Sequence, residues 1–203
     1  MAAPKNKYLS RIEGLLVTIG SLDGKLRELA KRRQNKKEEM RGITEGGASI
    51  ASPDADTDKD LNAQIAAISE QRSAIEAQKY LNQIFEEASK NKILEDGQDD
   101  QKGGGSFKCN SLEEASAMAH EIASTYEKLG FKCNISRDGN VFKVNVEVPK
   151  ELVGKDPLAM SADELLKARE LKDKKLETPN ASPKPFGKAE KPFNEIGAGV
   201  LQF

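Results

Sequence analysis

Apolar residues recur every three or four positions along the first part of the chain, which is the spacing of an amphipathic helix. Residues 5–42 carry one stripe with the alternating spacing of a coiled-coil seam and a second stripe beside it. The first stripe contains Leu9, Ile12, Leu16, Ile19 and Leu26, interrupted by Asp23, and the second contains Leu15, Leu22 and Leu29. The pattern predicts a helix whose apolar face is wide enough to touch more than one neighbour.

Three glycines, Gly14, Gly20 and Gly24, interrupt this helical pattern. A glycine in a helix interior costs about 1 kcal/mol of stability relative to alanine. The three residues therefore indicate either a close approach of another helix or a local break in this one.

A second amphipathic stretch runs from about Asp58 to about Leu94. Its apolar positions, again three and four apart, are Leu61, Ile65, Ile68, Ile75, Leu81, Ile84, Phe85 and Ala88. Arg72 and Lys79 occupy positions on the seam, where a polar residue fixes register or partner at some cost in stability.

Residues 42–60, between the two stretches, predict a loop that contains alternating aspartates from Asp54 to Asp60. An EF-hand calcium loop needs glycine at its sixth position and glutamate at its twelfth, and here Lys59 and Ile65 stand there. We therefore interpret the segment as an acidic loop. Two amphipathic helices joined in this way predict an antiparallel coiled-coil hairpin over residues 1–94, which packs on itself, on a partner or on another copy.

A segment rich in glycine and aspartate, residues 95–106, predicts a flexible linker and a domain boundary. The alternation in residues 107–149 then predicts a small β-α-β-β domain, with strands at 107–109, 131–135 and 141–148. Ser111 and Glu114 form a capping box that opens its helix, and Gly130 ends it. The order of elements implies a right-handed crossover and a three-stranded sheet with one helix on it.

Residues 150–177 predict a charged helical segment, opened by a second capping box at Ser161 and Glu164. Residues 178–203 contain four prolines, at positions 179, 183, 185 and 192, and predict an extended arm with an apolar tip. The predicted fold class is thus α+β: an N-terminal helical hairpin, a small β-α-β-β domain and an extended C-terminal arm.

Composition agrees with this plan, because 37% of residues are hydrophobic and 32% are charged, too polar for one packed core of this length. Residues 1–45 hold 11 Lys and Arg against 6 Asp and Glu, whereas residues 46–105 hold 6 against 12. These opposite charges can attract one another within the hairpin. The chain contains no apolar run that indicates a signal peptide or a membrane span, so a cytoplasmic location, or one inside an assembled particle, is expected.

The residues give little support for catalysis, and we expect no catalytic, cofactor-binding or metal-binding residues. His120 is the only histidine, and it lacks a nucleophile at a recognisable spacing. Cys109 and Cys133 are expected to be buried structural thiols, with a redox pair as the lesser alternative. Gly103–Gly105 precedes a strand and lacks the Lys-Ser/Thr signature of a phosphate-binding loop.

Nucleic-acid binding is the alternative function. A basic cluster in the first helix would contact phosphates; it consists of Lys31, Arg32, Arg33, Lys36 and Lys37. The sheet offers Phe107, Phe131 and Phe142, but each alternates with polar residues as a core position does, so we expect them to face the helix.

The arm favours a protein partner. Lys-Pro-Phe occurs twice, ending at Phe186 and Phe193, and proline-rich segments with aromatic anchors lose little entropy on docking. The residues expected to bind a partner are Phe186, Phe193, Ile196, Val200, Leu201 and Phe203. By analogy at the level of fold, this plan is that of subunits of large assemblies, virion components among them. The sequence therefore predicts an oligomeric structural or assembly protein that binds subunits of its own or another kind through its coiled-coil helices and its arm.

Overall fold

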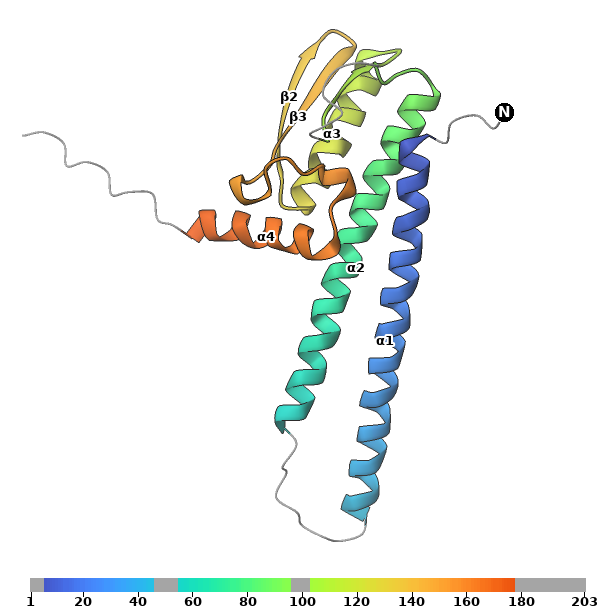
Figure 1. The fold of residues 1–203 in the computed structure, drawn as a ribbon, viewed down its shortest axis with the longest axis vertical. Helices are drawn as coiled ribbons and strands as arrows, with labels where there is room; N and C mark the ends of the chain where they lie inside the picture. The colour runs from blue at the N-terminus through green and yellow to red at the C-terminus, as the bar shows by residue number, and fades with distance from the viewer. Residues whose placement is uncertain (1–5, 46–54, 96–102, 178–203) are drawn as a thin grey trace, which may run out of the picture.

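The computed structural model describes residues 6–45, 55–95 and 103–177. Two long helices, α1 (Lys7–Glu45) and α2 (Ala55–Lys90), form a rod, and the other elements form a head at one end of it (Figure 1). The head contains strands β1 (Gly105–Lys108), β2 (Lys132–Asp138) and β3 (Val141–Glu147), helices α3 (Leu112–Lys128) and α4 (Ala162–Glu177), and the short 3₁₀ helices η1 (Lys150–Leu152) and η2 (Pro157–Ala159). The predicted α+β class is confirmed.

Contacts along the rod show that α1 and α2 are antiparallel. The rings of Tyr8 and Phe85 lie 5.6 Å apart near the head. Further out, Asp23 pairs with Arg72, and Lys36 Nζ lies 3.5 Å from Asp58 Oδ1. Later residues of α1 thus meet earlier residues of α2, which confirms the predicted helical hairpin.

The helix ends differ from the predicted ones by a few residues. α1 is continuous through Gly14, Gly20 and Gly24 and extends to Glu45, so the glycines cause no break. α2 begins at Ala55 and ends at Lys90, where Lys92 adopts a left-handed backbone conformation with φ 56°. The nine residues of the joining loop, 46–54, lie outside the described residues.

The sheet has the order β1-β3-β2, and β3 is antiparallel to both neighbours. β1 and β2 are therefore parallel to each other, and the connection between them passes through α3. Gly139, with φ 59°, lies in the turn between β2 and β3. This is the predicted β-α-β-β unit.

The hairpin and the head share one hydrophobic core. The ring of Phe85 in α2 packs edge to face on the ring of Phe107 in β1, with 5.2 Å between the ring centroids. The ring of Phe107 stacks on that of Phe142 in β3, with 4.8 Å between the centroids. All three side chains are fully buried. The small α/β unit is therefore built onto α2, because a sheet with a single helix leaves part of its apolar surface uncovered.

The predicted linker at 95–106 is wrong at both ends. The Glu95 amide donates to the Ser106 carbonyl at 2.9 Å, and Leu94 forms an antiparallel bridge with Phe107. Residues 94 and 95 therefore pair with the edge of β1 that β3 does not cover. The glycines at 103–105 are buried, and a Cβ on Gly104 would lie 2.4 Å from the Val144 carbonyl oxygen. These glycines permit close packing of backbone on backbone rather than free movement; residues 96–102 lie outside the described residues.

Both predicted capping boxes open helices. Ser111 Oγ accepts from the Glu114 amide at 3.1 Å, and the Glu114 carboxylate accepts from the Asn110 amide at 3.0 Å. At α4 the Ser161 amide donates to Glu164 at 2.9 Å. α4 then crosses α2 near the middle of the rod, so the half of the hairpin beyond it projects from the body (Figure 1).

Candidate protein-interaction surface

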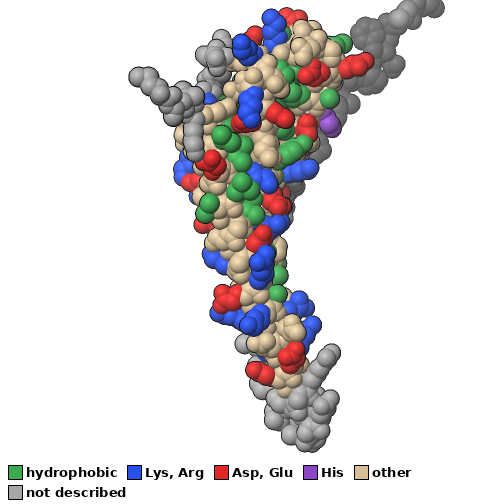
Figure 2. Space-filling model, turned by 90° about the vertical axis from the view of Figure 1, so that its right-hand side faces the viewer, with side chains coloured by type: hydrophobic (Ala, Val, Ile, Leu, Met, Phe, Trp, Pro, Cys, Tyr) green, Lys and Arg blue, Asp and Glu red, His purple; other side chains and the backbone are tan. Residues whose placement is uncertain are grey.

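The side of α1 that faces away from α2 carries exposed apolar residues. Leu9 is 38% exposed, Leu16 51% and Val17 75%. Figure 2 looks at this side of the rod and shows hydrophobic side chains gathered along its upper part. We call the side of α1 that contains Leu9, Glu13, Leu16, Val17, Gly20 and Gly24 the outer face.

The outer face contains part of the first predicted stripe, whereas the second stripe faces α2. Leu22 and Leu29 of the second stripe are buried, and Leu15 packs against the core. From the first stripe, Ile19 is buried against α2 but Leu9 and Leu16 are exposed. The first stripe therefore does not lie as one seam against α2, because the helix turns by about 100° per residue and carries Leu9 and Leu16 away from it. A face of α1 that could touch a second neighbour, as the sequence predicted, is thus exposed among the described residues.

Glycines on α1 have open space beside them. A Cβ added to Gly14, Gly20 or Gly24 would meet no atom within 4 Å. None of the three has a positive φ, so neither backbone conformation nor packing within the described chain requires glycine there. Gly20 and Gly24 lie beside Leu16 and Val17 on the outer face and leave open space next to them.

The basic cluster does not form one face. Arg33 and Lys37 line, with Ile65, a groove of about 520 Å³ between the two helices. Lys31 projects on the opposite side of α1, because it is two residues from Arg33 and the helix turns by about 100° per residue. Arg32 pairs with Glu28 at 2.5 Å, and Lys36 with Asp58.

The sheet presents no aromatic platform on its described residues. Phe107, Phe131 and Phe142 are all fully buried, as the alternation predicted. A base cannot stack on side chains that are covered by α2 and α3.

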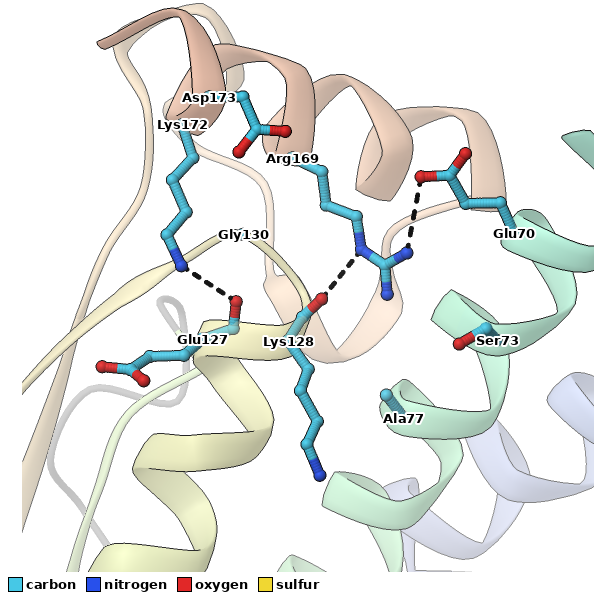
Figure 3. A pocket seen from close by; sticks show the side chains of 9 residues that line it. All are labelled: Glu70, Ser73, Ala77, Glu127, Lys128, Gly130, Arg169, Lys172 and Asp173. Atoms are coloured by element: carbon cyan, nitrogen blue, oxygen red, sulfur yellow. Dashed lines mark hydrogen bonds and ion pairs between the residues drawn. The ribbon is translucent and has the colours of Figure 1, made fainter. Parts of the chain in front are cut away.

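A polar cleft of about 420 Å³ lies where α2, α3 and α4 meet (Figure 3). Arg169 Nε of α4 donates to the Lys128 carbonyl at 2.8 Å, and Lys172 Nζ donates to the Glu127 carbonyl at 3.1 Å. Cations at a helix C-terminus are stabilised by its unpaired carbonyls and by the helix dipole. The cleft is thus the attachment of α4 to the end of α3, with Glu70 of α2 within 3.7 Å of the Arg169 guanidinium.

The residues considered for catalysis lie apart from this cleft. His120 is exposed on α3, while Cys109 is buried and Cys133 half-buried, both as free thiols. Burial raises the pKa of Cys109, and it raises the pKa of Cys133 to about 11. Thiols with raised pKa values carry little thiolate at neutral pH and are poor nucleophiles.

Among the described residues, no three His, Cys, Asp or Glu side chains gather as metal ligands would. No helix in the same part of the chain is long and apolar enough to cross a membrane. The arm residues predicted to bind a partner, from Phe186 to Phe203, lie outside the described residues.

Sequence reasoning did not identify Glu13, Val17 and Arg27 as part of an exposed face. The signal was present in the spacing: Leu9, Glu13, Leu16, Gly20, Gly24, Arg27 and Lys31 recur every three or four residues beside the buried stripe. Two of these positions are glycine and three are charged, so a search for apolar residues passes over them.

Comparisons with models of known families, with curated proteins and with solved structures give no match, and the geometry of this chain alone supports its candidate surface.

Proposed function

We propose that the protein is a non-enzymatic structural or assembly protein that binds other protein subunits through the outer face of α1 and through its C-terminal arm. The observation that carries the proposal is the exposure of Leu16 and Val17, 51% and 75%, on the side of α1 that faces away from α2. A neighbouring protein would remove this apolar surface from water, which favours association by about 25 cal/mol per Å² buried.

The arm supplies the second contact. Its aromatic anchors, Phe186 and Phe193, stand in a proline-rich segment whose restricted backbone loses little entropy on binding. Use of two separate contacts fits a subunit of a larger assembly, in the cytoplasm or within a particle, because each subunit can then join more than one neighbour.

Light scattering tests the arm. We expect the full chain to form a particle with more protomers than a chain that ends at Thr178, which retains every residue of the described core. Equal protomer numbers in the two chains would contradict the role of the arm in self-assembly. A double variant of the full chain, F186S/F193S, should behave like the shortened chain, whereas K184S/K191S should behave like the natural one.

Salt separates this proposal from nucleic-acid binding through Lys31, Arg32, Arg33, Lys36 and Lys37. Phosphate contacts weaken steeply as salt rises, whereas apolar docking does not. We expect the assembly to persist at 1 M NaCl and the natural chain to bind single- or double-stranded oligonucleotides no more tightly than a K31Q/R32Q variant. Tight binding that falls steeply with salt and is lost in K31Q/R32Q would favour the alternative.

A further inference from the structure

Residues at equal distances on either side of Gly20 complement one another on the outer face of α1. Leu16 and Gly24 lie four residues on either side of it, and Glu13 and Arg27 lie seven residues on either side. Offsets of four and seven residues return to the same side of an α-helix, so these positions form one line along the rod.

We propose that the occupant of this face is a second copy of the chain, bound antiparallel through a two-fold axis at Gly20. The inference rests on the proposed function, since it names the partner of the α1 surface. In a two-fold contact the same patch is used on both sides, so each residue must suit the residue that the symmetry places opposite it. Three matches on the outer face meet this requirement: Gly20 with itself, Leu16 with Gly24, and Glu13 with Arg27.

Steric fit is the first requirement. In the antiparallel pair Gly20 meets Gly20 of the second copy, which lets the two helix backbones approach closely at the crossing point. Leu16 then lies opposite Gly24 of the second copy, so a large side chain enters the space that a missing one leaves. The two glycines cost α1 about 1 kcal/mol each in helix stability, and no packing within the described chain explains them.

Charge is the second requirement, and it selects the direction. Glu13 and Arg27 are both exposed and lie fourteen residues apart on one helix, too far apart to pair with each other. An antiparallel partner places Glu13 opposite Arg27 twice, once on each side of the axis. A parallel partner would instead place Glu13 opposite Glu13, which is repulsive.

The head leaves this side of α1 open. It packs on α2 through η2, α3 and α4, and its ion pair with α1, Arg11 to Asp156 at 2.7 Å, lies on a different side of the helix from the outer face. Figures 1 and 2 show no described element over the outer face.

Two glycine variants of the full chain test the contact. G20L places a bulky side chain at the crossing point and should raise the dissociation constant of the dimer by about tenfold or more, measured by sedimentation equilibrium. G14L makes the same change on the same helix but on a side that the proposed axis does not use, and it should leave the dissociation constant unchanged. Leucine favours helix more than glycine does, so neither variant should unfold α1.

Charge reversal tests the direction. E13R and R27E should each weaken the dimer, and E13R/R27E should restore it, because the double variant again places opposite charges across an antiparallel axis. A G20C chain oxidised with copper phenanthroline should form a covalent dimer on a non-reducing gel, and G14C should not.

Two outcomes would overturn the inference and leave the assembly proposal intact. One is an oligomer whose dissociation constant G20L does not change; the other is a full chain that stays monomeric at high concentration and binds a different protein. The assembly proposal itself would fail if the full chain stayed monomeric, bound no protein, and bound oligonucleotides in a salt-dependent way.

Discussion

Arg72 of α2 lies opposite Asp23 of α1, with Arg72 Nε 2.5 Å from Asp23 Oδ1. Each residue interrupts the apolar seam of its own helix, and the two interruptions meet at the same level of the hairpin. Arg72 also contacts Glu76 one turn further along α2, at 3.0 Å. A polar pair at one level of a seam fixes the register of two helices, because any shift would leave both charges against apolar neighbours.

The pair predicts a clear pattern in a double-mutant cycle. D23L and R72L should each lower the urea midpoint of unfolding, because each leaves one charge without its partner. The combined D23L/R72L chain should be at least as stable as the natural one, since two leucines continue the seam. The coupling energy between D23L and R72L should be smaller in 1 M NaCl, because salt screens the ion pair. As a control, R32A removes an exposed ion pair within α1 and should change the urea midpoint little. Additive effects of D23L and R72L would contradict a shared role.

The sequence predicted the elements of the fold because their signals are local. The spacing of Leu22 and Leu29, the capping serines and the alternation around Val144 each depend on a few neighbouring residues. The shared core could not be predicted in this way, because the packing of Phe85 on Phe107 joins residues far apart in the chain. The glycines at 103–105 were predicted to be part of a linker because the contact that requires them is also distant in the chain. Composition alone does not reveal that the Val144 carbonyl lies against Gly104.

The candidate surface was predicted only in part. Two apolar stripes on α1 indicated a second neighbour, but periodicity alone cannot say which stripe α2 covers. The second stripe, which contains Leu22 and Leu29, is the one buried against α2, and Leu16 of the first stripe remains on the outer face. The sequence also did not predict that the side chains of Gln78 and Asn82 are buried, because both are polar and lie outside the predicted seam of α2.

Gln78 is fully buried on α2 and holds the segment before α4. Its Nε2 donates to the Pro157 carbonyl at 2.8 Å and to the Met160 carbonyl at 3.0 Å. Q78L would leave both carbonyls buried without a donor, and we expect it to lower the free energy of unfolding by about 2 kcal/mol. Urea unfolding measures the change, with Q83L, an exposed position on the same helix, as the control. Equal stability of Q78L and Q83L would contradict this role.

Gly130 joins α3 to β2 against the backbone of α4. Its φ is 90°, and a Cβ there would lie 2.7 Å from the Arg169 amide nitrogen. G130A should therefore cost more than the strain of a left-handed residue, about 1–2 kcal/mol, because α4 must also move. G154A is the matched control, since Gly154 has φ 87° but open space around it. Thermal unfolding of the two variants measures the difference, and equal melting temperatures would show that the contact with α4 adds nothing.

Burial of acidic groups in their neutral form predicts a loss of stability at high pH. The pKa of Cys133 is raised to about 11 by burial, and burial also raises the pKa of Cys109 and of Tyr126. In the unfolded chain a thiol ionises near pH 8.5, so between about pH 8.5 and 11 the unfolded state binds fewer protons than the folded state. The free energy of unfolding must then fall as pH rises through this window.

Urea unfolding at pH 8 and pH 10.5, with reductant present, measures this dependence. We expect a lower midpoint at pH 10.5 for the natural chain and a smaller difference between the two pH values for C133S, because serine does not ionise in this range. Lysines also lose charge near pH 10.5, but they do so in both chains, so the difference between the natural chain and C133S isolates the thiol. The same pH dependence in both chains would mean that Cys133 ionises as readily in the folded state as in the unfolded state.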